Sequence, residues 1–220
     1  MAIVWPCPLS VDAYAAAGRT LEVPRPDCPD CGRAMIFWSG YLRPVRLPGR
    51  CVRLFIRRVR CRGCALTHAL LPAFVLHKRL DAVEVIGAVL EAVARGEHGV
   101  RPAASAVDVP HATARGWWRR FSERANVHAV SFSALGVELG APAMTAPGVW
   151  GALAAISAAF SAAASLPGWA ATSRWHFCSA VSGGRLLAAN TTSPYLVLGR
   201  RRFMPPVPFP NETGEQRGGP

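Results

Sequence analysis

The sequence predicts an α+β protein in which a small β-rich module comes first and helices follow. Two C-x2-C pairs, Cys28/Cys31 and Cys61/Cys64, bracket a segment in which apolar and polar residues alternate with period two. From residue 80 onward the apolar residues take helical spacing instead. The expected architecture is a small four-cysteine zinc ribbon, then a helix-turn-helix bundle, then an Ala-rich helical C-terminal region.

Composition divides the 220 residues into five stretches. They are an N-terminal extension (1–27) with a short helix at 11–17, the zinc ribbon (28–72), the helix-turn-helix domain (80–127), the Ala-rich helical region (130–199) and a disordered tail (200–220). With 51% hydrophobic residues, the chain can bury one large core or two to three small ones.

The charge balance favours a polyanionic partner. The net charge is +12 and the pI about 10.6, values that suit nucleic acid or an anionic membrane surface. Codon bias is an alternative explanation for the use of arginine over lysine, but it does not explain the excess of base over acid. DNA, in duplex form, is the expected partner.

The cysteines indicate a reducing compartment. The first eight residues lack the basic and apolar regions of a secretory signal, so we expect a cytoplasmic protein. In the cytosol, paired cysteines are more typical of metal ligands than of disulfides.

The spacing of the cysteine pairs predicts one structural Zn²⁺ held by Cys28, Cys31, Cys61 and Cys64. Four thiolates close the tetrahedral shell and leave no open position for catalysis. Two alternatives stay open: unrelated free or redox cysteines, and His68 in place of one cysteine. We also expect chelation to unfold the module, because so small a unit has little core of its own.

The segment between the pairs predicts a hairpin with a basic face. Strands are expected at 35–42 and 52–59, with a turn at Pro48-Gly49 and a bulge near Arg57 and Arg58. Trp38 and Phe55 are assigned to the core. Nine arginines and no acidic residue occur between residues 33 and 62; the DNA-binding candidates among them are Arg53, Arg57, Arg58 and Arg60. The alternative is an ordinary solvated face.

Three helices are expected next, at 81–95, 102–107 and 112–125. Asp81 is the expected N-cap of the first, with Glu84 completing a capping box, and Gly96 ends it. The last two helices, joined by a turn at 108–110, have the layout of a helix-turn-helix. The residues expected to face DNA are His111, Thr113, Arg115, Arg119 and Arg120, while Ala114, Trp117 and Phe121 form the buried side. An ordinary helical hairpin is the alternative.

Taken in order, these motifs resemble a known group of proteins. CPDCG at 28–32, GY at 40–41, RRVRCRGC at 57–64 and THALLP at 67–72, followed by the helix-turn-helix, are similar to the N-terminal region of insertion-sequence transposases. They also resemble uncharacterised bacterial proteins with the same zinc-ribbon pattern. The resemblance covers residues 28–126 and implies DNA binding in a transposon-associated or transposase-derived protein.

The carboxylates of a transposase nuclease are missing from the expected place. After Glu138 the next acidic residue is Glu212, so the acidic triad that would hold two metal ions has no candidates. We therefore expect a non-catalytic protein without a small-molecule substrate. The alternative function is a protein-interaction adaptor whose zinc module docks on an acidic protein.

The Ala-rich region has no charged residue from 139 to 173. Residues 149–166 reach the length of a membrane span, but alanine is nearly neutral toward insertion, so we expect a close-packed helix. Serines spaced four apart would suit tight helix packing or a homodimer.

Overall fold

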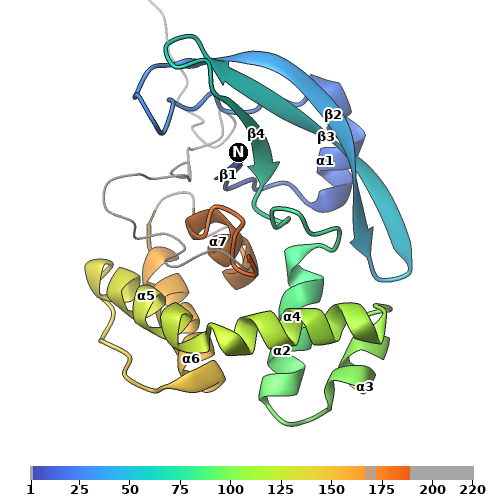
Figure 1. Ribbon diagram of the computed structural model, residues 1–220, viewed down its shortest axis with the longest axis vertical. Coiled ribbons are helices and arrows are strands. Elements are labelled where there is room, and N and C mark those ends of the chain that lie inside the picture. The colour runs from blue at the N-terminus through green and yellow to red at the C-terminus, as the bar shows by residue number, and fades with distance from the viewer. Residues whose placement is uncertain (1, 167–168, 170–171, 189–220) are drawn as a thin grey trace, which may run out of the picture.

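The computed structural model describes residues 2–166, 169 and 172–188, and this part is a mixed α+β structure (Figure 1). The α+β class is therefore confirmed. The strands are β1 (Ala2–Trp5), β2 (Met35–Leu47), β3 (Arg50–Cys61) and β4 (Thr67–Pro72). The helices are α1 (Val11–Ala17), the 3₁₀ helix η1 (Gly18–Thr20), α2 (Val83–Ala94), α3 (Val100–Ser105), α4 (His111–Glu123), α5 (Ala125–Glu138), α6 (Gly148–Ala163) and α7 (Arg174–Val181).

The strands form one sheet in the order β1-β4-β3-β2. β2 and β3 make a long antiparallel hairpin whose pairing runs from Met35↔Cys61 to Leu47↔Arg50, and Gly49 turns it with a φ of 69°. Both predicted strands are confirmed and extend beyond the predicted bounds. β4 pairs antiparallel with β3 and parallel with β1.

The predicted irregularity lies on the partner strand. The register shifts between Phe37 and Ser39, so Trp38 is the extra residue of a bulge in β2. Trp38 is 55% exposed, and its assignment to the core was wrong. A bulge inserts one residue without a partner, and here that residue projects into solvent instead of packing.

The first 27 residues contribute to the same sheet and core. β1 is a fully buried apolar strand, and α1 begins at Ser10, whose hydroxyl accepts a hydrogen bond from the Ala13 N–H. The buried Tyr14 donates its hydroxyl proton to the Phe55 carbonyl, 3.1 Å away. The sheet therefore draws its strands from both the predicted extension and the predicted ribbon.

The N-cap of α2 lies one residue later than predicted. It is Ala82, without a side-chain hydrogen bond, so the prediction of Asp81 as N-cap was wrong. Asp81 is buried instead against Arg46 of the hairpin, with an Nη2–Oδ2 distance of 2.9 Å. Asp81 thus pairs with an arginine of the hairpin instead of capping α2. Gly96 does follow the helix, with a φ of 71°.

α2, α3 and α4 pack on one another. The turn between α3 and α4 contains Asp108 at a φ of 54°, and α4 then buries Ala114, Trp117 and Phe121, as predicted. In Figure 1, α4 and α5 lie nearly end to end, separated by Arg124. The predicted boundary near residue 127 falls inside α5.

The Ala-rich helix α6 packs against α5. A Cβ added at Gly136 of α5 would lie 3.6 Å from the Ala159 backbone of α6, so the two helices approach closely. Alanine and glycine line this contact, whereas Ser157 and Ser161 lie along a pocket beside α2 and α7. Within the described ranges, no helix combines the length and apolarity needed to cross a bilayer.

α7 joins the sheet to the helices. It contacts β1, α2 and α6, and lies between the two parts in Figure 1. Its Trp175 packs over Gly87 of α2 and donates an indole hydrogen bond to Glu91, 2.6 Å away. The buried apolar residues of sheet and helices thus form one core. The predicted tail (200–220) and the end of the Ala-rich region (189–199) lie outside the described residues.

Candidate metal centre and basic surfaces

The four paired cysteines meet at one end of the sheet. Cys28 and Cys31 lie just before β2, and Cys61 and Cys64 lie at and just after the end of β3. Because Met35 pairs with Cys61, the hairpin brings the two pairs together. The Cys28 N–H bonds the Arg33 carbonyl at 2.8 Å, and the Cys61 N–H bonds the Leu66 carbonyl at 2.9 Å, which closes each loop.

The sulfur positions suit a tetrahedral ion. All four Sγ atoms lie within 4.8 Å of one another, and the shortest Sγ–Sγ distances are 3.3 Å (Cys31–Cys61) and 3.5 Å (Cys28–Cys64). A tetrahedron with metal–sulfur bonds of about 2.3 Å has sulfur–sulfur edges of about 3.8 Å. The cluster could therefore hold a metal ion such as zinc with small adjustments.

The two cysteine loops share a backbone feature. The residue that follows the second cysteine of each pair has a left-handed backbone, with a φ of 70° at Gly32 and 58° at Ala65. The Gly63 N–H points at the Cys61 sulfur, 3.3 Å away. Hydrogen bonds from the backbone of Cys64, and more weakly of Gly63, lower the pKa of Cys61 to about 6. The thiolate, which is the form that binds metal, is therefore favoured at Cys61. At Cys64 a backbone hydrogen bond that lowers the pKa is outweighed by burial and by bonds to the neighbouring thiols, which raise the pKa to about 12.

His68 stands beside the cluster. Its ring Nε2 is 3.9 Å from an Asp30 carboxylate oxygen, and both residues group with Cys28 as potential ligands. The tight group of four consists of the cysteines, so His68 is placed next to one ligand and not in place of one. The isolated Cys51 is an exposed residue of β3 and lies outside the cluster.

Several arginines of the basic run have partners within the fold. Arg43 is buried and donates to the carbonyls of Leu76, at 2.7 Å, and Arg79. Arg46 pairs with Asp81, and Arg50 with Asp12 at 2.5 Å. The two aspartates, which lie outside the run, thus neutralise part of its positive charge, and the carbonyls satisfy the donors of the buried Arg43.

The four candidate arginines of β3 differ in their surroundings. Arg57 donates to the carbonyls of Arg19 and Leu21, at 2.6 and 3.2 Å, so its guanidinium anchors η1. Arg58 donates to the Thr67 hydroxyl at 3.0 Å. Arg60 lies over the ring of the exposed Trp38, 4.8 Å from its centroid. Arg53 is exposed. DNA contact by these residues stays a prediction.

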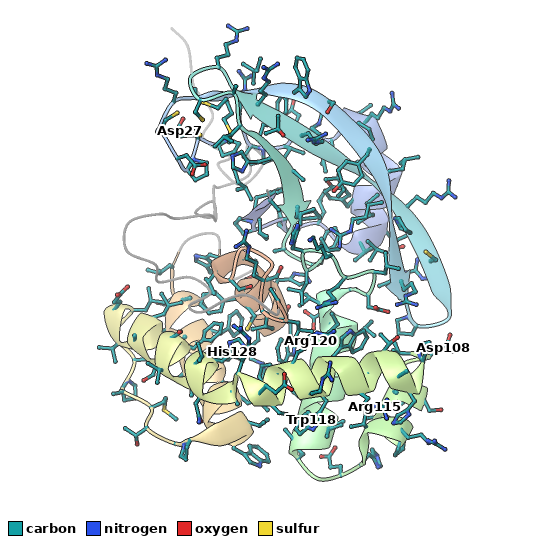
Figure 2. All side chains as sticks on the ribbon, viewed as in Figure 1. Asp27, Asp108, Arg115, Trp118, Arg120 and His128 are labelled. Atoms are coloured by element: carbon teal, nitrogen blue, oxygen red, sulfur yellow. The ribbon has the colours of Figure 1, made fainter. Side chains whose placement is uncertain are left out.

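The five candidates on α4 differ in how far they are exposed (Figure 2 labels Arg115 and Arg120). Arg115 and Arg119 are exposed, and Arg119 lies 3.9 Å from Glu123 of the next turn. Arg120 is half-buried and donates to the Gly116 carbonyl at 2.9 Å. His111 and Thr113 occupy the first turn and are also half-buried. The candidates on α4 and the candidates on β3 therefore belong to two different elements of the fold.

Sequence reasoning missed the exposed aromatic residues of β2. Phe37, Trp38 and Tyr41 are 38–55% exposed. Arg25 and Arg57 both lie over the Phe37 ring, 5.5 and 5.0 Å from its centroid. The interleaving of arginine and aromatic residues was the available signal, but only the bulge decides which rings leave the core.

Comparison with known proteins concerns the cysteine-bearing part. Residues 28–108 match a family model described as Domain of unknown function (DUF6431). No curated protein and no solved structure matches the chain. The matched stretch contains all four paired cysteines, β2–β4, α2 and α3, and ends just before α4. The similarity therefore concerns the metal centre and its support more than the basic helix.

Proposed function

We propose that the protein is a zinc-dependent, non-catalytic DNA-binding protein that is transposon-associated or transposase-derived. The zinc would be structural, held by the four cysteines as a ribbon. Duplex DNA would be bound by α4 as the second helix of a helix-turn-helix. The similarity of residues 28–126 to the N-terminal region of insertion-sequence transposases supports the assignment to mobile elements.

The observation that carries this proposal is the two-sided character of α4. Its apolar side is buried on α2 and α3, while its other side presents Arg115 and Arg119 to solvent. A tight turn at Asp108 sets the helix off from α3. A helix held in this way, with its basic side outward, can enter a major groove. The net charge of +12 would attract DNA from a distance.

The metal ion would hold the two strands of the hairpin together at one end of the sheet. It would tie the start of β2 to the end of β3, and the exposed end of the hairpin carries Arg33 and Arg62 beside the cysteines. These arginines sit where a second stretch of phosphate backbone could be contacted. DNA binding by the sheet would then depend on zinc, whereas the shape of α4 would not.

The test is fluorescence anisotropy of the full chain with a labelled duplex at several salt concentrations. We expect log K to fall with log salt with a slope of about −2.7 to −3.6, as for three or four neutralised phosphates. Arg115→Gln should weaken binding roughly tenfold. Arg95→Gln, on the exposed end of α2, is the charge-matched control. Salt-independent retention, or equal effects of the two variants, would refute the proposal.

One observation favours the adaptor alternative. β2 is an edge strand with exposed Phe37, Trp38 and Leu42, and such an edge can pair with another protein. The double variant Arg53→Ala/Arg115→Ala should abolish DNA binding under the first function and leave capture of an acidic protein nearly intact under the second.

A further inference from the structure

A hollow of about 360 Å³ opens on one face of the sheet. It crosses all four strands, and its lining includes Ala2 of β1, Ala69 of β4, Arg58 of β3, and Ser39 and Tyr41 of β2, with His77 at one side. Ala2 pairs with Ala69, and Ala69 with Arg58, so two small side chains lie side by side next to the arginine. The volume lies at the lower end of that of small-molecule sites.

The charges around this hollow have one sign. None of the described residues that line it is acidic. Burial, and then the positive charges of Arg185, Lys78 and Arg43, lower the pKa of His77. The Arg58 guanidinium carries five N–H donors, and its bond to Thr67 uses one. The hollow is therefore suited to an anion, and a planar guanidinium suits a phosphate.

Aromatic rings lie at the same place. Tyr41 lines the hollow and is 41% exposed. Trp38 precedes Ser39 on β2, and Arg60 lies over its ring on the same side of β3 as Arg58. Exposed rings beside arginines form a platform on which an unpaired base can stack. A base inside a duplex is already stacked on its neighbours and cannot reach such a platform without being extruded.

We propose that the hollow binds one unpaired nucleotide, with its phosphate at Arg58 and its base against Tyr41 and Trp38. The inference rests on the proposed function and deepens it, because it gives the sheet a ligand different from the duplex bound by α4. The nucleotide could belong to a single strand or be free in solution, since both offer the same phosphate and base.

The test compares two probes on the full chain at one salt concentration: a labelled oligothymidine of about 15 nucleotides and a labelled duplex. Ser39→Phe fills the hollow without changing charge, at an exposed strand position that tolerates phenylalanine. Arg58→Gln removes the phosphate contact. We expect each to weaken single-strand binding about tenfold or more and duplex binding by less than about twofold. Circular dichroism and zinc content check folding.

The matched control is Arg95→Gln, which removes the same charge from an exposed position outside the hollow. It should change single-strand binding by less than about twofold. Equal losses for Arg58→Gln and Arg95→Gln would refute the site, as would unchanged single-strand binding by Ser39→Phe. In either case duplex binding that depends on Arg115 would survive, so failure of this inference is distinct from failure of the proposed function.

Competition separates the two sources of the nucleotide. If thymidine 5′-monophosphate displaces the oligothymidine from the wild-type chain, the hollow accepts a free nucleotide. If only the strand binds, while Ser39→Phe loses it, the hollow serves a strand. Displacement by inorganic phosphate as effective as by the mononucleotide would contradict the role of the base and overturn the proposal.

Discussion

Asp81 and Arg46 join the hairpin to the start of α2. Asp81 is 2% exposed. Two backbone hydrogen bonds also link the two elements. The Arg46 N–H donates to the Leu80 carbonyl at 2.7 Å, and the Ala82 N–H donates to the Arg46 carbonyl at 3.0 Å. Asp81→Ala leaves the Arg46 guanidinium without its carboxylate. We expect the free energy of unfolding, measured in urea, to fall by about 1–3 kcal/mol.

The control for that change is Asp12→Ala. Asp12 forms the exposed ion pair with Arg50, so its removal should leave the unfolding curve nearly unchanged. A larger loss at Asp12 than at Asp81 would contradict the role given to the buried pair. Sequence reasoning placed Asp81 as a local cap because the partner, 35 residues earlier, is visible only in the folded chain.

His128 makes stability depend on pH. It is buried and stacked on Phe121, with ring centroids 5.2 Å apart. Burial, and then the positive charge of Arg124, lower the pKa of His128 to about 4, although a backbone hydrogen bond with Leu186 raises it. In the unfolded chain the pKa is about 6.5.

Between about pH 6.5 and pH 4 the unfolded chain therefore binds a proton at His128 that the folded chain does not. The free energy of unfolding should fall as pH falls through this window, by up to about 3 kcal/mol, and the contribution should level off below about pH 4. His128→Phe keeps a ring against Phe121 and should flatten this part of the profile. An unchanged slope in the variant would exclude His128 as its source.

Helix α2 depends on a glycine that helix propensity alone would reject. A Cβ at Gly87 would lie 2.1–2.4 Å from the nearest atoms of the Trp175 ring. Gly87→Ala should therefore lower the free energy of unfolding by about 1–3 kcal/mol through overpacking. At Gly116 of α4 the nearest atom is the flexible end of Arg120, 2.9 Å away, so Gly116→Ala should be neutral or raise stability by up to about 1 kcal/mol. Thermal unfolding of both variants checks the contrast.

Elements with a regular pattern were predictable from sequence. The alternation in 52–59 identified β3, and the spacing of Val83, Ile86 and Leu90 identified α2, because one side of each element is buried. The parallel pairing of β1 with β4 was not predictable, since a four-residue apolar run carries no information about its partner.

The candidate sites were predictable to different degrees. The cysteine pairs carry their own spacing, and the structure brings them together. The residues that line the hollow in the sheet come from four strands and a loop, so no local sequence motif predicts it. The Trp38 side chain is exposed because of a one-residue register shift in β2. The alternation of residues predicted this irregularity in β3 instead.

The sheet and the helices share one hydrophobic core, and this affects how far the protein should unfold when the metal is removed. Met35, Leu54, Ile56 and Val59 of the hairpin are buried in the same cluster as the residues of α2 and α7. The expectation that chelation unfolds the ribbon treated it as a separate small module with little core of its own, whereas the hairpin shares its core with the helices. We now expect chelation to raise hydrogen exchange at 28–34 and 62–66 while helical circular dichroism is retained. Global loss of helix would contradict the shared core.

The zinc dependence of the proposed function rests on one zinc ion held jointly by Cys28, Cys31, Cys61 and Cys64. The decisive experiment is the zinc content per chain of metal-replete full-length protein, compared with Cys61→Ser and Cys51→Ser. We predict about one zinc in the wild type and in Cys51→Ser, whose thiol lies outside the cluster, and none in Cys61→Ser. Zinc absent from the wild type, or retained equally in Cys61→Ser, would contradict the four-cysteine site.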